Sequence, residues 1–275
     1  MKRLINLSPS LGGRWLLGLL PFVLLAMVYL SLSNARLAEN PNDRLLPAPA
    51  TMAQSFHHLA TAENVRTGQV TLWADTFASL ERLLIGVTIS ALIGLSVGLL
   101  NGGLPLIRAK LSPLVTVVSL IPPMAILPIL FIAFGTGEAA KIALIVIGVT
   151  PFLIRDLQGH ALRLPDEQLI KAQTLGGSSW QILVRVLLPQ LTPRLLNATR
   201  LALGTAWLFL IAAEAIASQE GLGYRIFLVR RYLSMDVILP YVAWITFLAF
   251  LLDQALAWTS RLAFPWYHAG EGDQK

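Results

Sequence analysis

Six long runs of apolar residues constrain this chain more than any other feature of its sequence. Each run lies near the ~20 residues that an α-helix needs to cross a lipid bilayer. Only 13% of the residues are charged, against roughly 25% in soluble domains. Within a bilayer every backbone N–H and C=O group must be bonded inside the protein, which favours helices. The sequence therefore predicts an all-α, polytopic membrane protein with six transmembrane helices, at residues 15–33, 83–100, 111–134, 142–154, 201–218 and 237–258.

The lysines and arginines predict how the chain is oriented in the membrane. Most of the 21 fall in segments on the same side as the N-terminus, so the positive-inside rule places both termini in the cytoplasm. The first apolar run follows Lys2, Arg3 and Arg14, as the core of a signal peptide would. It is longer than the ~7–15 residues of such a core, which favours a span that is retained. Residues 34–77 are then expected to form an outer loop, too short to be a domain.

Composition and motifs argue against several classes of protein. The chain has no cysteine, which excludes thiol catalysis and iron–sulfur clusters. Its cationic residues are dispersed around apolar runs, a distribution typical of membrane orientation rather than of nucleic-acid binding. Residues 135–141 resemble a phosphate-binding loop, but Ala140 replaces its second glycine and Ile142 replaces its Ser or Thr. His57 and His58 would point to different sides of a helix, with no further ligand nearby. We therefore expect no catalytic residue, cofactor site, metal site or nucleic-acid partner.

A polar segment at residues 164–193 separates the fourth apolar run from the fifth. Pro165 suits the first position of a helix, and Asp166 and Glu167 suit the positive end of the helix dipole. The glycine pair at 176–177 suits the point where a helix ends. These residues predict one short helix of about three turns.

A second short helix is predicted directly after the glycine pair. Ser178 and Gln181 have the spacing of a capping box, and Trp180, Leu183, Val184 and Leu187 follow at helical spacing up to Pro189. Two short helices that meet at a glycine corner would form a compact knob on the surface. Such a knob suits a groove on another protein, whereas an amphipathic pair lying flat on the bilayer remains the alternative.

Two features inside the apolar runs are candidates for a transport pathway. Glu214 lies within the fifth run, where a carboxylate is costly and by default faces a cavity, a pathway or a partner charge. A protonated or paired Glu that locks helices together is the alternative. Pro122, Pro123 and Pro128 interrupt the third run, where they free backbone carbonyls and bend the helix. A proline kink that serves only helix packing would give the same sequence pattern. Close helix packing, rather than chemistry, is expected at Gly86, Gly94 and Gly98.

The segment at 172–179, followed by Pro189 and Pro193, resembles the cytoplasmic EAA loop of ABC importer permeases. The chain departs from that signature at its start, where residues 170–172 read Ile-Lys-Ala instead of Glu-Ala-Ala. Further segments are similar to the branch of the family that includes nitrate, taurine, sulfonate and bicarbonate permeases. These segments are residues 79–82, 121–128 with 134–135, 212–214, 221–223 and 264–266.

The resemblance implies a type I ABC importer permease-like fold and a division of the chain. Residues 1–78 would form the cytoplasmic N-terminus, first span and outer loop, residues 79–266 the core permease domain, and residues 267–275 a cytoplasmic tail. The knob would be the coupling helix, seated in a groove of the ATP-hydrolysing subunit. The residues implied in this contact are Ala172, Leu175, Gly176, Gly177, Ser178 and Pro189, and those implied in the translocation pathway are Glu214, Pro122, Pro123 and Pro128.

The resemblance also implies partners and a location. The chain would be a non-catalytic subunit in the bacterial inner membrane, paired with a second permease copy as a homodimer and with two copies of an ABC ATPase subunit. An extracytoplasmic binding protein would deliver a small solute, with an anion such as nitrate, taurine or an alkanesulfonate implied by the branch.

Two other classes remain as alternatives. A passive channel would share the spans but has no need of a glycine-cornered knob. A membrane enzyme acting on a lipid would use Glu214, Asp156 or His160 as acid–base groups, yet no nucleophile–base spacing or metal-ligand cluster accompanies them. Binding of an ATPase subunit distinguishes the importer from both.

Overall fold

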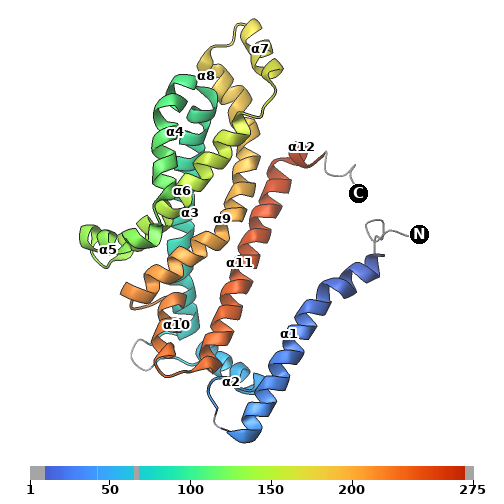
Figure 1. The fold of residues 1–275 in the computed structure, drawn as a ribbon, viewed down its shortest axis with the longest axis vertical. Helices are drawn as coiled ribbons and strands as arrows, with labels where there is room; N and C mark the ends of the chain where they lie inside the picture. The colour runs from blue at the N-terminus through green and yellow to red at the C-terminus, as the bar shows by residue number, and fades with distance from the viewer. Residues whose placement is uncertain (1–9, 42, 65–67, 270–275) are drawn as a thin grey trace.

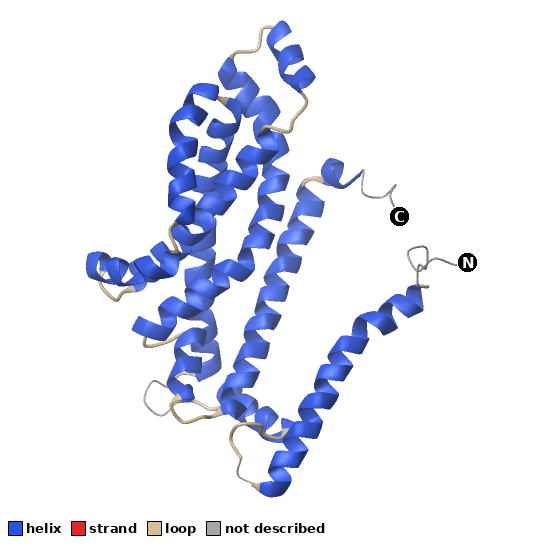
Figure 2. Cartoon of the chain, viewed as in Figure 1, coloured by secondary structure: helices blue, strands red, loops and turns tan. Residues whose placement is uncertain are grey.

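The computed structural model describes residues 10–41, 43–64 and 68–269. The expected cytoplasmic ends therefore lie outside the described residues at 1–9 and 270–275. Apart from one isolated β-bridge between Glu63 and Val70, the described part of the chain is built from helices and their connections (Figure 2). The helices are α1 (Leu11–Glu39), α2 (Pro49–Thr61), α3 (Thr71–Gly103), α4 (Pro105–Leu120), α5 (Pro123–Phe134), α6 (Glu138–Ala161), α7 (Asp166–Thr174), α8 (Ser179–Ile182), the π-helical turn η2 (Leu183–Leu187), α9 (Leu188–Ala217), α10 (Leu222–Arg230), α11 (Met235–Ala263) and α12 (Pro265–His268).

The all-α membrane fold is confirmed, but the count of six spans is not. Among the described residues, 4 helices are long and apolar enough to cross a membrane, and the number rises to 5 if α4 and α5 count as one broken span. The 4 are Gly12–Glu39, Thr71–Gly103, Ser179–Ala217 and Met235–Ala263. The helix α6, which holds the predicted run 142–154, is not among them; it packs between α3 and α9 and carries charged residues toward both ends.

The tightest packing in the bundle joins α3 to α6 along a row of small residues. A Cβ atom added to Gly94 would lie 2.7 Å from the Cβ of Leu153, and one added to Gly98 would lie 2.8 Å from the Cβ of Leu157. Gly86 meets Ile145 in the same way. Glycines four residues apart let two helix backbones approach closely. The close packing predicted for these glycines is therefore confirmed.

The third predicted span is broken rather than merely bent. The helices α4 and α5 meet at an angle of 94°, and Pro122 and Pro123 form the N-cap and first position of α5. Proline has no N–H to continue a helix, and it disfavours helical backbone in the residue before it. The helix α5 consequently projects from the side of the bundle (Figure 1). We call this break the elbow.

Residues 34–77, which were expected to form an outer loop, are partly helical. The helix α1 continues to Glu39, α2 occupies Pro49–Thr61, and α3 begins at Thr71. The expected domain boundary after residue 78 accordingly falls inside α3. The extension arises because Asp75 and Thr76, which read as polar loop residues, are buried in the first turns of α3.

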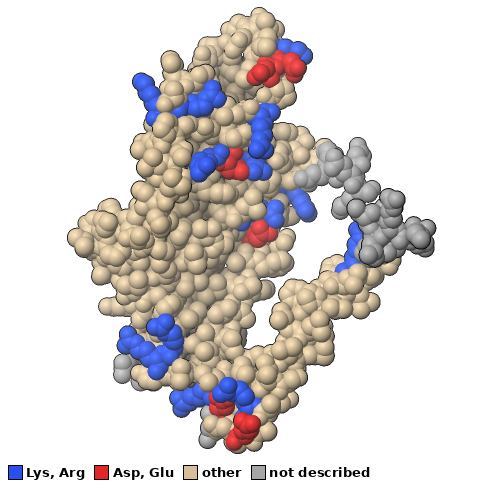
Figure 3. Space-filling model, viewed as in Figure 1, with Lys and Arg blue, Asp and Glu red and all other residues tan. Residues whose placement is uncertain are grey.

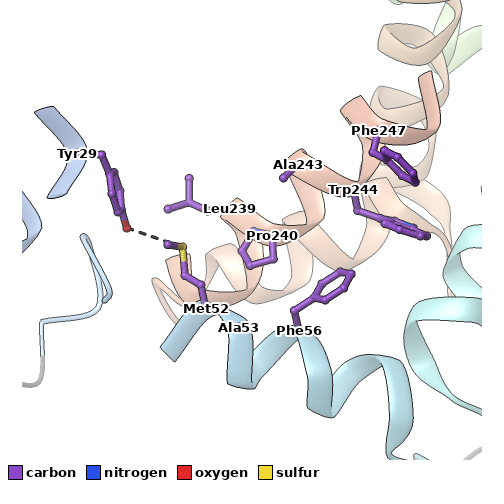
Figure 4. A pocket seen from close by; sticks show the side chains of 9 residues that line it. All are labelled: Tyr29, Met52, Ala53, Phe56, Leu239, Pro240, Ala243, Trp244 and Phe247. Carbon is purple, nitrogen blue, oxygen red and sulfur yellow. Dashed lines mark hydrogen bonds between the residues drawn. The ribbon is translucent and has the colours of Figure 1, made fainter. Parts of the chain in front are cut away.

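The helix α1 stands away from the rest of the bundle (Figure 1). Only 6% of its apolar 18-residue stretch is buried inside the molecule. The contacts that hold α1 lie near its connection to α2. The Tyr29 hydroxyl donates to the Pro47 carbonyl at 2.7 Å, and the Ser33 hydroxyl donates to the Leu46 carbonyl at 3.0 Å. A cavity of about 750 Å³ lies where α1, α2 and α11 meet, with an almost wholly apolar lining that includes Tyr29, Phe56 and Trp244 (Figure 4).

The charges of the visible face gather at two levels (Figure 3). One level includes α7 and the helix ends near it, and the other includes α10 and the start of α11. Uncharged residues cover the zone between the two levels. This distribution is typical of a protein whose middle lies in hydrocarbon and whose ends lie in water and headgroups.

Candidate coupling surface and transport pathway

The first predicted helix of the polar segment is confirmed as α7. Its N-cap is Pro165, and its last residue is Thr174. Beyond the helix, Gly176 has φ +78°, a conformation in the left-handed region where only glycine is free of steric cost. The Gly177 N–H then donates to the Ala172 carbonyl at 3.0 Å. The chain therefore turns sharply at the glycine pair, as its sequence predicts.

The capping box that starts the next helix is also confirmed. The Gln181 N–H donates to the Ser178 hydroxyl at 3.3 Å, and the Ser178 N–H donates to the Gln181 side-chain oxygen at 2.9 Å.

The predicted end of this helix at Pro189 is wrong. The helix widens instead, because the Leu188 N–H bonds to the Leu183 carbonyl five residues back. One π-helical turn thus carries the chain past Pro189, which has no N–H, and α8, η2 and α9 form one continuous helix.

Large apolar side chains are exposed around the glycine corner, at the far end of the molecule (Figure 1). Leu175 is 88% exposed, Trp180 68% and Ile170 56%. We call Ile170, Leu175 and Trp180 the coupling surface. A bond of 3.1 Å from the Gln190 amide to the Gln168 amide oxygen ties α7 to α9 beneath it. Exposed apolar residues on a rigid projection are typical of a surface that a partner covers.

The residues implied in this contact differ in their exposure. Leu175, Gly176 and Ser178 are exposed at the corner, whereas Ala172 and Gly177 are half-buried, where they form the backbone bond of the turn. Pro189 is exposed on the shaft of the continuous helix, two turns beyond Ile182. Five of the six residues therefore gather at the corner, and Pro189 lies apart from them. Their role in partner binding stays a prediction.

Glu214 lies near the other end of the continuous helix, one turn before Ala217. Its side chain is fully buried. The Arg82 guanidinium donates to it at 2.7 Å, the Ser79 hydroxyl at 2.8 Å and the Gly223 N–H at 2.9 Å. Each carboxylate oxygen thus has a donor, which compensates the desolvation of the charge.

The pairing of Glu214 is part of a larger group, which we call the Arg82 cluster: Arg82, Glu138, Lys141, Glu214 and Glu220. Arg82 also bonds Glu138 through two nitrogens, one of them at 2.9 Å, and the Glu220 carbonyl at 3.0 Å. Lys141 donates to Glu138 at 2.9 Å. The cluster borders a polar cavity of about 580 Å³. It ties together α3, α6 and the connection between α9 and α10.

Sequence reasoning counted Arg82 only as a surface cation and missed its ion pairs. A signal was present, since Asp75, Ser79 and Arg82 are spaced four and three residues apart and so share one face of a helix. Asp75 is fully buried and accepts from the Gly221 N–H at 3.0 Å and from Arg225 at 2.8 Å. This polar face of α3 fixes the connection to α10.

The structure does not bring the candidate pathway residues together. Glu214 belongs to the Arg82 cluster, whereas Pro122 and Pro123 form the elbow and Pro128 lies inside α5. A separate cavity of about 500 Å³ lies at the elbow. Asp156 borders this cavity and accepts from Arg194 at 2.7 Å. The roles of Glu214 and the three prolines in a pathway stay predictions.

Comparison with known proteins agrees with the arrangement of these helices. Residues 90–262 match the model of the family described as binding-protein-dependent transport system inner membrane component. The taurine transport system permease protein TauC of Escherichia coli (strain K12) is 34% identical over 81% of this chain and 80% of that protein. The bicarbonate transport system permease protein CmpB of Synechococcus elongatus is 37% identical over 69% of each protein.

A solved structure supports the same fold. Inward-facing conformations of the MetNI methionine ABC transporter superpose with a TM-score of 0.61 at 24% identity, over 70% of this chain and 95% of that chain. At this identity the likeness concerns the fold alone. The family model, by contrast, covers well over half of the chain, and the sequence relatives are permeases more than 30% identical to it. The chain therefore belongs to the family of binding-protein-dependent transport system inner membrane components, the permeases of ABC transporters.

Proposed function

We propose that this chain is the membrane subunit of an ATP-driven importer and that it provides the path for a small anion. The observation that carries the proposal is the coupling surface, in which three large apolar side chains are exposed on a projection built by a glycine corner and a capping box. An apolar, preorganised helix pair of this kind suits a groove on an ATP-hydrolysing subunit. The chain itself would be non-catalytic, with ATP hydrolysed by that partner.

The proposed assembly has the end that carries α7 in the cytoplasm. Two ATPase subunits would bind there, one on each of two permease copies that form a homodimer in the bacterial inner membrane. An extracytoplasmic binding protein would deliver the solute at the end that carries α10. The orientation follows from the excess of Lys and Arg on the α7 side.

Transport would follow from movement of the coupling surface. Closure of the ATPase pair would push the glycine corner, and the continuous helix would carry the displacement toward the Arg82 cluster. The elbow prolines and Glu214 would lie on helices that switch between the two arrangements. Coupling of this kind needs two states and an element that both sites bias.

The solute class rests on the relatives, which are named as taurine and bicarbonate permeases. Taurine carries a sulfonate and bicarbonate is itself an oxyanion, so we propose a small oxyanion for this chain. Nitrate and alkanesulfonates belong to the same class.

A matched pair of glycine variants tests the coupling role. Gly176 has φ +78°, Gly159 has helical backbone, and a Cβ added to either meets open space. We expect Gly176→Leu to weaken binding of the ATPase subunit about tenfold. The left-handed backbone costs a residue with a side chain roughly 1–2 kcal/mol, and the added side chain enlarges the corner that enters the groove of the partner. Gly159→Leu should bind normally. The measurement is ATPase recovery with the tagged permease from detergent-solubilised membranes.

The same purification separates the importer from its alternatives. Wild-type chain that recovers no ATPase subunit, even after crosslinking in a mild detergent, would favour the passive channel or the lipid-acting membrane enzyme. Equal recovery with both glycine variants would instead retain the importer and remove the glycine corner from the contact.

A further inference from the structure

The elbow cavity has a polar side as well as an apolar one. Its volume is about 500 Å³, and it is lined by the elbow and by the C-terminal half of α6. Ile121, Pro123 and Pro151 supply apolar surface, whereas Ser119 and Arg155 supply donors. A cavity with apolar walls and a few convergent polar groups is the usual form of a small-molecule site.

Arg155 keeps most of its hydrogen-bonding capacity. Within the described part of the chain, its one hydrogen bond runs from Nη1 to the Ser119 hydroxyl at 3.0 Å. Ser119 in turn donates to the Thr116 carbonyl at 2.8 Å. A guanidinium has five N–H donors in a planar fork. Arg155 is thus positioned by one bond and leaves the other donors for a ligand.

The charge of Arg155 is also uncompensated by an ion pair among the described residues. The neighbouring carboxylate, Asp156, is occupied by Arg194, whose Nε donates to it at 2.7 Å. No salt bridge of the described chain includes Arg155. Arg155 and Asp156 both line the cavity; Arg194 compensates the charge of Asp156, so the charge left without an ion pair at the cavity is that of Arg155.

Arg155 lies inside the helix rather than at its end. It precedes Ala161, the last residue of α6, by six positions, or about 9 Å along the helix axis. Its side chain is exposed and lines the elbow cavity, so its free donors are accessible to a solute.

We propose that Arg155, positioned by Ser119, binds the oxyanion group of the transported solute in the elbow cavity. The proposal rests on the proposed function, in which the solute is a small oxyanion. A planar guanidinium matches the geometry of sulfonate and carboxylate oxygens through two parallel bonds. The elbow then places this binding site at the hinge between α4 and α5, beside the helix that leads to the coupling surface.

The absence of native cysteine makes a charge-restoration experiment direct. Arg155→Cys is assembled with the ATPase and binding protein in vesicles of neutral phosphatidylcholine, and ATP-dependent uptake of taurine and bicarbonate is measured. We expect uptake at least about tenfold below wild type, the loss for one charge-assisted contact worth about 1.5 kcal/mol. Labelling with a trimethylammonium methanethiosulfonate should restore much of the uptake, whereas a sulfonate-bearing methanethiosulfonate should not.

Two controls keep the result interpretable. Arg261→Cys removes an exposed cation from α11 that lies outside the elbow cavity, and it should transport normally with either label. ATP hydrolysis by the Arg155→Cys complex reports whether the subunits are assembled. Wild-type complex treated with both reagents accounts for any cysteine in the partner subunits.

The outcomes separate this inference from the proposed function. Equal uptake by Arg155→Cys, Arg261→Cys and wild type would overturn the inference and leave the anion importer intact. Wild-type complex that takes up neither anion would overturn the solute class and the inference with it. If the uptake defect of Arg155→Cys appears only in vesicles that contain phosphatidylglycerol and not in neutral phosphatidylcholine, Arg155 is assigned to a lipid phosphate and the inference is overturned.

Discussion

The coupling surface and the Arg82 cluster lie near opposite ends of one continuous helix and are built in opposite ways. Around the glycine corner, backbone bonds and a capping box hold the chain, and large apolar side chains remain exposed. Around Glu214, charged side chains hold three helices together, and Arg82, Lys141 and Glu214 are buried. The first region is held by short-range bonds along the chain, and the second by ion pairs between distant residues.

This difference teaches where each kind of substitution acts. A buried ion pair that loses one partner leaves an uncompensated charge, so its loss affects folding. An exposed apolar side chain contributes little to folding, so its loss affects whatever covers it. Transport by the proposed importer would need both regions, for different reasons.

The largest expected effect is that of Arg82→Met, which would leave the Glu214 carboxylate buried without its cation. We expect the free energy of unfolding to fall by about 3–5 kcal/mol. The measurement is thermal unfolding of the purified complex in detergent. Arg261→Met, which removes an exposed cation, is the matched control and should unfold like wild type.

A double variant sharpens this test. Arg82→Met with Glu214→Gln removes both charges, so it should be less destabilised than Arg82→Met alone. A double variant that loses the sum of the two single effects would show that the pair is not coupled. Glu214→Gln alone also tests the pathway prediction, because normal transport at every pH would exclude a role for its charge.

Gly221→Ala should have the next largest effect. Gly221 has φ +126°, and an added Cβ would lie 2.5 Å from the carboxyl carbon of Glu214. We expect a loss of about 1–3 kcal/mol in unfolding free energy from backbone strain alone, together with displacement of the carboxylate. Gly204→Ala, whose Cβ meets open space, should be neutral or slightly stabilising. If both variants unfold alike, the Glu214 contact does not constrain this turn.

Leu175→Asp should change stability least, by less than about 0.5 kcal/mol, because the side chain is exposed. It should nevertheless lower recovery of the ATPase subunit, since it places a charge in the apolar coupling surface. Leu106→Asp is the matched control, as Leu106 is 81% exposed outside that surface. A variant that loses stability instead of partner binding would reverse the comparison between the two regions.

Local patterns predicted the coupling region better than the Arg82 cluster. The exit of α7 and the capping box at Ser178 depend on residues within five positions of each other, so the sequence alone contains them. The bond between Arg82 and Glu214 joins residues 132 positions apart, and one sequence without relatives carries no direct signal of that contact. The sequence predicted the fold, and the spacing of Asp75, Ser79 and Arg82 indicated a polar helix face without identifying Glu214 as its partner.

The errors at proline have a common cause. Pro122, Pro123 and Pro189 each lack a backbone N–H. The helix continues past Pro189 through one π-helical turn, whereas it breaks at Pro122 and Pro123. Two successive prolines remove two donors and fix both backbones, whereas a single proline near a helix start needs only a local change of bonding. Proline content therefore indicates a disturbance without deciding its size.

The unbroken helix from Ser179 to Ala217 has a mechanical consequence. Its 39 residues extend over at most about 58 Å. By simple geometry, a rigid tilt of about 5° at one tip displaces the other by about 5 Å at that length. The molecule in this sense contains a lever arm, and the wide turn at Leu183–Leu187 is the place where its stiffness would be adjusted.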